Sequence, residues 1–503
     1  MQAVKLAGTS VRALRVRQGR VRFAAPKHDS PQSMWWQFAL DGTVGPHVDC
    51  VWEHTEEVLG GGGLGAAVPV YRQDGSWRRV PVRGCHFDAE HRELHFRVPT
   101  GGGRVEVAYC YPYGADRVAE LLHRLAQTRE GRVRTIGRSE QRRPFKLAEV
   151  GHGPRHVWLT ARHHAGEVSG AYVLEGLLRR AARWPELWDR LTIHAAPVMD
   201  VDGVAGGMYG KDRTPRDYNR DYVATPCRLE VAALMEAAEA VGEAHIFVDL
   251  HAPAPGDRSF FIPVEEPLAG LDHWQAAWEL ARLVEVMAPA GCPCRVADLS
   301  RHSLRWYGDL LRQVSTNYFY HRFGGLSMTL ETTYHRSWNG RLATPGAWQG
   351  LGRALLDAIA VREGLLPAPD VSGIELPPST IPRLAKWWCL FVPEGLELQE
   401  QARSLSLTGA GKTTAAAVMA RLLRQEGPQA TFAYRLEGTL RELAVVAKGF
   451  DSASGLATGT HDRVVVPLTP SHTWQTVSVP HSQAAYRVIF RVEGLDGRLD
   501  LRT

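Results

Sequence analysis

The sequence predicts an α/β protein with a mixed-sheet domain in its middle, flanked by an N-terminal and a C-terminal β-sandwich. Short segments of alternating apolar and polar residues occupy residues 1–108, and strands alternate with amphipathic helices over residues 109–366. Closely spaced strands return in residues 383–503, after a stretch rich in Pro and Ser at 367–382 that is typical of a linker. We therefore expect three folded units, the last of jelly-roll type.

The N-terminal unit begins with a predicted hairpin. Residues 11–23 alternate apolar with basic side chains on either side of Gln18-Gly19. Further strands are expected at residues 35–40, 67–71, 93–98 and 105–109. The glycine runs at 60–63 and 101–103 lack a following Lys-Ser/Thr pair, so we interpret them as loops rather than phosphate-binding sites.

The middle unit alternates two periods of hydrophobic residues. Apolar runs predict strands at residues 157–161, 191–198, 246–250 and 326–330. Amphipathic patterns predict helices at 115–130, 170–184, 229–241, 272–287 and 346–362. This alternation indicates a parallel or mixed sheet covered on both faces, in which functional side chains gather where strands end.

The C-terminal unit contains apolar strand-like runs at residues 430–436, 443–447, 463–467, 474–479 and 486–492. Residues 407–414 read Leu-Thr-Gly-Ala-Gly-Lys-Thr-Thr, and the helix-like residues 415–424 follow them. This resembles a phosphate-binding loop, but Ser406 occupies the place of its first glycine, and too few residues remain for a nucleotide-binding sheet. We favour a polar turn over nucleotide binding.

Composition excludes several classes of function. The 503 residues are 44% hydrophobic and 22% charged with a net charge of +5, which is ordinary for a globular protein and does not indicate nucleic-acid binding. No apolar run is long enough to span a membrane. The first 28 residues are basic and without acids, as in a mitochondrial transit peptide, but the hairpin pattern is the better interpretation, and we expect cytoplasmic residence.

The seven cysteines are odd in number and scattered along the chain. This pattern favours reduced thiols over a disulfide framework and agrees with a cytoplasmic protein. Cys292 and Cys294 lie close together, but no second pair stands at the spacing of a metal site.

Several polar residues stand where predicted strands end. His164 and Glu167 follow the strand at 157–161 in one turn, and His251 follows an apolar strand. An imidazole and a carboxylate in one turn, completed by a second imidazole, form a donor set that suits zinc. Glu331 ends another strand and is a candidate general base. Asn219 and Arg220 end a long polar loop and could hold a carboxylate through a bidentate fork and an amide.

Taken in order, these motifs resemble the zinc metallocarboxypeptidases of the carboxypeptidase A type, and most closely their cytosolic carboxypeptidase subgroup. The resemblance covers about residues 30–360. It rests on His164-x-x-Glu167, the Asp202-Gly-Val204 turn, Asp217-x-Asn219-Arg220, His251, Thr329-Leu-Glu331 and the segments at 107–113 and 136–139.

The resemblance implies an enzyme that hydrolyses the C-terminal peptide bond of peptides or proteins, with one zinc ion per chain. His164, Glu167 and His251 would hold the zinc and leave a fourth position for water. Glu331 would take a proton from that water and deliver it to the leaving amine. Asn219 and Arg220 would bind the substrate's free carboxylate, and Asp217 would accept a hydrogen bond from His164.

The chain departs from the family in two places. Gly210 stands where the family has an Arg that polarises the scissile carbonyl; Lys211 is the nearest replacement and Arg213 is another. The family's mobile substrate-capping Tyr is expected before the Ser315-Thr316 step, and Tyr307 is the closest upstream Tyr.

Specificity and activity leave alternatives open. Arg301, Arg305, Arg312 and Arg322 favour a preference for acidic C-terminal residues, but Asn317, which follows the Ser315-Thr316 step, is not basic. A second hypothesis is a related zinc amidase or deacylase that acts on a cell-wall peptide or an N-acyl amino acid. A third is a catalytically weakened binding protein, with a glycan or protein ligand on its C-terminal domain. We expect neither nucleic acid nor membrane as a partner.

Overall fold

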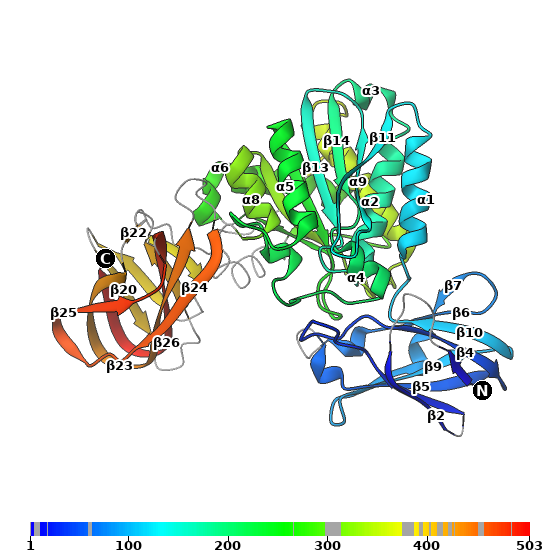
Figure 1. Ribbon diagram of the computed structural model, residues 1–503, viewed down its shortest axis with the longest axis horizontal. Helices are drawn as coiled ribbons and strands as arrows, with labels where there is room; N and C mark the ends of the chain where they lie inside the picture. Colours follow the sequence, from blue (N-terminus) through cyan, green and yellow to red (C-terminus); the bar gives the residue numbers. More distant parts are fainter. Residues whose placement is uncertain are drawn as a thin grey trace.

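The structure is a computed structural model in which β-sheets flank a central α/β unit (Figure 1). It describes residues 2–4, 11–17, 19–58, 63–264, 266–296, 313–374, 387–391, 396–401, 404–409, 416–420, 425–426, 428–450, 457–483 and 485–502. Among these residues no helix is both long and apolar enough to cross a membrane.

The N-terminal part contains two five-stranded sheets. The order of the first is β1 (Gln2–Val4), β4 (Gln37–Thr43), β10 (Gly103–Ala108), β6 (Val70–Arg72) and β7 (Trp77–Arg79). The order of the second is β2 (Arg12–Arg17), β3 (Arg20–Ala24), β5 (His47–Glu53), β9 (Glu93–Pro99) and β8 (Cys85–Asp88). β2 and β3 form the hairpin that the alternating sequence predicts.

Aromatic side chains join these two sheets. Phe23 of β3 lies 4.8 Å from Phe38 of β4 between ring centroids, and Trp36 lies 5.7 Å from Phe96 of β9. All four side chains are buried. The core of the N-terminal part is therefore the space between the sheets, and burial of such large rings is its main source of stability.

The central unit is built on a seven-stranded sheet. Its order is β11 (Gly131–Arg138), β12 (Pro144–Val150), β14 (Leu191–Ala196), β13 (Arg155–Ala161), β15 (Ile246–His251), β17 (Leu326–Glu331) and β16 (Phe260–Pro263). The four strands from β14 to β17 in this order are parallel, and the remaining pairs are antiparallel. The sequence predicts the four parallel strands but not the antiparallel edges.

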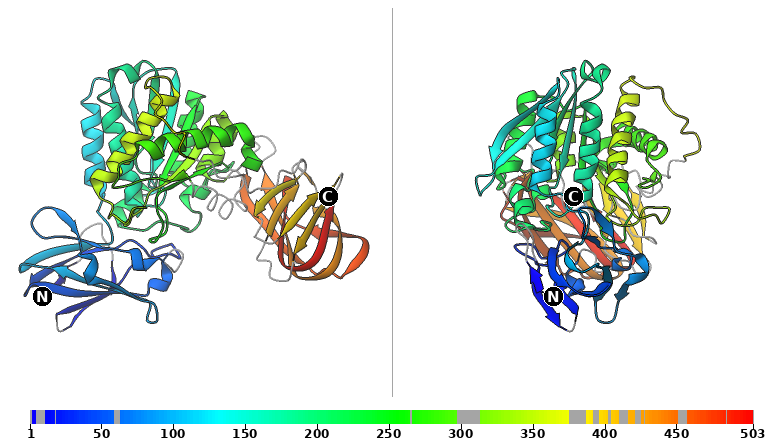
Figure 2. Two further views of the ribbon diagram at one scale, coloured as in Figure 1. Left: turned by 180° about the vertical axis from the view of Figure 1, so that it is seen from behind. Right: turned by 90° about the vertical axis from the view of Figure 1, so that its right-hand side faces the viewer.

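Helices cover both faces of this sheet. Leu159 and Val248 belong to the core that includes α2 (Val168–Ala181), α6 (Glu266–Met287) and α9 (Pro345–Arg362). Trp158 and Phe247, one position earlier on each strand, point to the opposite face and join the core of α5 (Leu229–Val241) and α8 (Ser315–Phe323). In the view from behind, α6 and α9 lie over their face of the sheet (Figure 2). This alternation explains why the strands are apolar throughout.

The N-terminal part packs directly on the central unit. Arg79 of β7 donates hydrogen bonds to the carbonyl oxygens of Tyr334 and Ala343, the latter at 3.0 Å. The ring of Tyr109 lies 5.3 Å from that of Tyr334, which follows β17. Because one buried apolar core includes residues of both parts, the two parts form a shared interior rather than loosely tethered bodies.

The C-terminal part is a nine-stranded sheet on which the chain folds back repeatedly. Its two longest strands are β23 (Gln429–Phe450) and β26 (Ala485–Arg502). The first half of β23 pairs with β25 (Ser471–Pro480) and its second half pairs with β24 (Ala457–Val466). On its other edge, β23 pairs with β26 along most of its length. Buried apolar residues from both halves, among them Phe432, Leu443 and Phe490, form one core.

The sequence patterns of this part mislead in two places. The runs at 430–436 and 443–447 predict two strands but belong to the single strand β23, because Gly438 with φ +101° lets the chain continue against Gly497 of β26. The helix-like pattern at 415–424 is, at Ala416–Ala420, the strand β21, which pairs with β18 (Trp387–Phe391) and β26. Residues 410–415 of the phosphate-loop-like motif lie outside the described residues, but the strand after them removes the helix that a phosphate loop requires.

Candidate active site

The candidate site lies at the carboxyl ends of three parallel strands. His251 and Glu331 are the last residues of β15 and β17 and stand opposite each other in register. Ala161 ends β13 beside Leu250, and His164 and Glu167 follow in the turn that leads into α2. Parallel strands present their ends at one edge, so residues far apart in sequence meet there.

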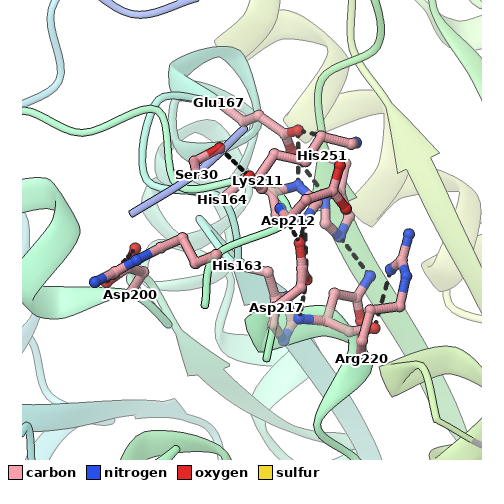
Figure 3. Close-up of polar contacts among 12 residues, drawn as sticks. Ser30, His163, His164, Glu167, Asp200, Lys211, Asp212, Asp217, Arg220 and His251 are labelled. Carbon is pink, nitrogen blue, oxygen red and sulfur yellow. Dashed lines mark hydrogen bonds and ion pairs between the residues drawn. The ribbon is translucent and has the colours of Figure 1, made fainter. Parts of the chain in front are cut away.

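Three potential ligand groups converge in this place. Nδ1 of His164 lies 2.7 Å from Oε1 of Glu167, and Nδ1 of His251 lies 2.7 Å from Oε2 of Glu167. The ligand atoms of these three residues all lie within 4.8 Å of one another, and all three residues are buried. Figure 3 shows their side chains turned toward one another. Two imidazoles and one carboxylate form a donor set suited to a zinc ion with one open position.

Carboxylates hold the far nitrogens of both histidines. Nε2 of His164 lies 3.1 Å from Asp217, and Nε2 of His251 lies 2.7 Å from Asp249. Such contacts fix the Nε2–H tautomer and leave Nδ1 free to bind a metal. Burial lowers the pKa of His251, but Asp249 and Glu167 outweigh it and hold that pKa well above its usual range. The negative charge around the two histidines therefore favours a cation bound between them.

The turn of His164 is held from two sides. Arg162, with φ +61°, donates from Nε to the carbonyl oxygen of Ala165 at 2.6 Å. A Cβ atom at Gly166 would lie 2.9 Å from the ring of Tyr209 and 3.0 Å from Cβ of Trp35. Only glycine fits between them, so this residue fixes where the turn lies.

A second group of potential ligands overlaps the first. His163, Asp249 and His251 also bring their ligand atoms within 4.8 Å of one another. However, Nδ1 of His163 contacts Asp249 at 2.8 Å and Nε2 contacts the hydroxyl of Tyr222 at 2.8 Å. Because both nitrogens of His163 are used, this residue is a poor ligand and serves instead to hold Asp249.

Glu331 has the environment of a general base. Its Oε2 atom is buried and has no hydrogen-bond partner among the described residues. Burial raises the pKa of Glu331 to about 7, although the positive charge of His251 opposes this shift. A carboxyl with such a pKa can accept and return a proton near neutral pH.

Lys211 faces the same centre, and Gly210 explains how. Nζ of Lys211 lies 3.7 Å from Oε1 of Glu167, and the side chain is almost fully buried. Gly210 has φ +89°, and a Cβ atom there would lie 2.6 Å from the backbone nitrogen of Ala165. Position 210 therefore has no room for the Arg that the family resemblance implies, and the tight loop presents the next side chain instead.

Arg213, the other candidate replacement, is engaged elsewhere. Its guanidinium donates to both oxygens of Asp200 at 2.7 Å and to Asp29 at 2.7 Å. Asp200 caps α4 (Val201–Gly206) through the backbone nitrogen of Gly203. Figure 3 shows Asp200 on the side of Lys211 away from His251. The structure thus brings Lys211, and not Arg213, to the candidate metal ligands.

Asn219 and Arg220 lie beside His251 in a short helical turn (Tyr218–Arg220). Nδ2 of Asn219 lies 3.0 Å from Nε2 of His251, and its Oδ1 accepts from the backbone nitrogen of Ser315 at 3.0 Å. Nη1 of Arg220 donates to the carbonyl oxygen of Asn219 at 3.0 Å. Asn219 is thus fixed within the site, whereas Arg220 is partly exposed at its edge.

Several residues named from the sequence do not enter the site as the structure describes it. Tyr307, Arg301, Arg305 and Arg312 lie outside the described residues. Arg322 pairs with Glu239 at 3.2 Å, and both side chains are exposed. Asn317 is buried, and its Nδ2 atom has no hydrogen-bond partner among the described residues.

Sequence reasoning missed Asp249. Its Oδ1 atom accepts from Thr160 at 2.7 Å and its Oδ2 atom from Ser315 at 2.6 Å, in addition to its contacts with His163 and His251. The sequence contained a signal for it, because residues two apart on a strand face the same side and Asp249 precedes His251 by two.

Comparisons with known proteins agree with this geometry. Residues 118–227 match the family model described as zinc carboxypeptidase, a stretch that contains His164, Glu167, Asn219 and Arg220. Cytosolic carboxypeptidase 6 of Caenorhabditis elegans is 27% identical over 234 residues, which cover 39% of this chain and 49% of that protein. Cytosolic carboxypeptidase 3 of Bos taurus is 24% identical over 224 residues, or 39% of this chain and 21% of that protein.

The fold has a solved counterpart. A metallo-carboxypeptidase from Burkholderia cenocepacia superposes with a TM-score of 0.64 at 24% identity and covers 72% of this chain and 98% of that one. The chain matches only about a fifth of the bovine relative and half of the nematode relative.

Proposed function

We propose that this chain, a metallocarboxypeptidase whose middle part contains a zinc carboxypeptidase domain, removes the last residue of peptides or proteins with one zinc ion per chain. The observation that carries this proposal is the convergence of His164, Glu167 and His251 beside a buried carboxylate oxygen of Glu331 that has no hydrogen-bond partner in the part of the chain that the structure describes. The peptide substrate, the zinc and cytoplasmic residence are each part of the proposal. The six cysteines whose side chains are described are free thiols, which supports the last.

The residues fit the metal they would hold. His164 and His251 direct Nδ1 toward the oxygens of Glu167, while Asp217 and Asp249 hold their Nε2 atoms. Four carboxylates surround this place, those of Glu167, Asp217, Asp249 and Glu331, and the ammonium of Lys211 lies among them. An excess of negative charge in a buried site favours a divalent cation.

Zinc, when bound, would supply Lewis acidity toward the scissile carbonyl and lower the pKa of water. Glu331 would take a proton from the attacking water and give it to the nitrogen of the leaving amino acid. Lys211 would donate from Nζ to the carbonyl oxygen as negative charge develops on it. A buried ammonium is well suited to this task because the surrounding protein screens it little.

Arg220 and Asn219 would bind the free carboxylate of the substrate's last residue. Arg220 is the stronger candidate, because its guanidinium lies at the exposed edge of the site, whereas the amide of Asn219 is already bound to Ser315. Tyr307 stays a proposed substrate contact from sequence alone. A preference for acidic side chains would rest on Arg301, Arg305 and Arg312, since Arg322 pairs with Glu239 at the surface.

We also propose that the flanking sheets are the N-terminal and C-terminal β-sandwiches of residues 1–108 and 383–503. The aromatic contacts between the first two sheets support the former. The C-terminal sheet would carry a separate binding role, with a glycan or a protein as its ligand.

A panel of peptides that differ only in the last residue tests the proposed function. The 503-residue chain loaded with zinc should release one amino acid at a time, and the rates across the panel give the side-chain preference. Release from N-acyl amino acids but not from peptides would favour the zinc amidase. Binding of peptides without turnover of either substrate class would favour a catalytically weakened protein.

A further inference from the structure

The N-terminal part reaches into the loop that carries Lys211. The backbone nitrogen of Thr214 donates to the carbonyl oxygen of Asp29 at 3.0 Å, and the hydroxyl of Ser30 donates to the carbonyl oxygen of Lys211. Nε2 of Gln32 donates to Asp212 at 2.6 Å. Residues 29–32 therefore contact each residue from 211 to 214 in turn, counting the ion pair of Asp29 with Arg213.

The ion pair is the strongest of these contacts. Arg213 donates from Nε to both oxygens of Asp29 at 2.9 Å and from Nη2 at 2.7 Å, while Nη1 binds Asp200 at 2.7 Å. Arg213 is nearly fully buried, and Asp200 is fully buried. A guanidinium held between two carboxylates in this way has its geometry fixed on both sides. It ties the loop to α4 on one side and to the N-terminal part on the other.

The residues on either side of the segment 29–32 are fixed to another part of the N-terminal unit. The backbone nitrogen of Ser33 donates to the carbonyl oxygen of Glu57 at 3.0 Å, and the carboxylate of Glu57 accepts from the hydroxyl of Ser33 at 3.2 Å. Lys27 pairs with the same carboxylate at 3.0 Å. The hydroxyl of Ser30 accepts from the nitrogen of Gln32 at 3.0 Å, which sets the local turn. These contacts hold residues 29–32, called the arm below, in place.

We propose that residues 29–32 of the N-terminal part are a positioning element for Lys211, with Asp29 and Ser30 as its main residues, so that the active site is complete only with the N-terminal sheets in place. This inference rests on the proposed role of Lys211 in catalysis. The contacts act on the backbone of Lys211 and Thr214 and on the side chains of Asp212 and Arg213. Lys211 is thus held directly through its carbonyl oxygen and indirectly through the residues that follow it. None of the four arm residues is a metal ligand.

The arrangement predicts a specific kinetic signature. A displacement of about 1 Å in a catalytic group costs on the order of a hundredfold in rate. Loss of the arm should therefore lower kcat while leaving KM unchanged, because Arg220 and Asn219, which would hold the substrate, do not contact residues 29–32 among the described contacts. Zinc content should also stay the same, because no described contact joins residues 29–32 to His164, Glu167 or His251.

The test introduces Asp29→Ala, Asp29→Glu and Ser30→Ala into the 503-residue chain, with Asp41→Asn as the control. Asp41 also belongs to the N-terminal sheets and pairs with Arg104 at 3.3 Å, but it lies away from the loop. Asp29→Ala and Ser30→Ala should lower kcat at least about tenfold with unchanged zinc content, in protein that is still folded at the assay temperature. Asp29→Glu should restore part of the rate, and Asp41→Asn should equal the unmodified protein.

A second readout needs no activity. Lys211 and Arg213 are buried, so trypsin should cleave after them slowly in the unmodified protein and much faster in Asp29→Ala. An unchanged kcat and cleavage pattern in Asp29→Ala would overturn the inference, as would a fall in kcat that only follows loss of zinc and of thermal stability. If the unmodified protein releases no amino acid from any peptide, the proposed function fails, and the cleavage comparison still decides whether the arm holds the loop.

Discussion

Nζ of Lys211 lies 3.7 Å from Oε1 of Glu167, whereas a side chain at position 210 would collide with the backbone of Ala165. The absence of the family's Arg at position 210 and the position of the Lys211 side chain therefore have the same structural cause. The loop needs glycine at φ +89° to pass Ala165, and the next residue then points to the candidate metal ligands. On this account Lys211 supplies, from the next position, the positive charge that the family's Arg provides.

Substitution of Lys211 tests this relocation. Lys211→Met keeps the length of the side chain and removes its charge, so kcat should fall by about a hundredfold or more, as it does when one oxyanion donor is lost elsewhere. Zinc content should not change, because Lys211 is not among the three ligands. Steady-state kinetics on one peptide measures the effect, and Lys146→Met, a lysine on β12, is the matched control. Equal rates for both variants would exclude a catalytic role for Lys211.

Removal of the metal should abolish activity and lower thermal stability together. A ligand that binds only the folded state raises the free energy of unfolding, so the apo protein should unfold at a lower temperature and recover on addition of zinc. His251→Ala should lose both zinc and the zinc-dependent shift. Calorimetric scans with and without a chelator provide the measurement. Full activity in metal-free protein would contradict the proposal that His164, Glu167 and His251 hold a catalytic zinc ion.

Asp249 should matter for the metal although it is not a ligand. Asp249→Asn removes the charge that orients His251 through Nε2, and outer contacts of this kind typically change metal affinity by about 10- to 100-fold. Competition with a chromophoric chelator gives the affinity. Asp189→Asn, whose parent side chain is 80% exposed, should leave it unchanged.

Glu230 should make stability depend on pH. Burial raises its pKa from the usual value of 4.5 to about 7, and its oxygens lie 3.5 Å from the hydroxyl of Tyr218. Between these two values the folded state holds a proton that the unfolded state releases. This contribution to stability is therefore complete below about pH 4.5 and is lost as the pH rises through about 7. Glu230→Gln stays neutral, so its unfolding free energy relative to the parent should increase over this interval, and denaturant unfolding at several pH values measures it.

The sequence predicts the central unit well because its signals are local. The pattern over 229–241 coincides with α5, and the strands that end in His251 and Glu331 are apolar runs with a polar residue at the end. Local patterns mispredict secondary structure where distant strands determine it by hydrogen bonding. Ala416–Ala420 has the composition of a helix but becomes a strand because β18 and β26 offer it hydrogen bonds on both sides.

The same distinction holds within the site. His164, Glu167, His251 and Glu331 are visible in sequence because each ends a strand or follows one. The pairing of Asp29 with Arg213 spans 184 residues and has no local pattern, so it becomes visible only in three dimensions. The choice between Lys211 and Arg213 likewise depends on the close approach of Gly210 to Ala165, which no spacing rule contains.

The most direct test of the central claim compares the parent protein with Glu331→Gln on one peptide, with a free or an amidated C-terminus, followed by mass spectrometry and metal analysis. The account predicts that both proteins carry about one zinc per chain. Only the parent should shorten the free peptide by its last residue, and neither should shorten the amidated one. Zinc-loaded parent protein that leaves the free peptide intact, or Glu331→Gln that shortens it as fast as the parent, would contradict the account.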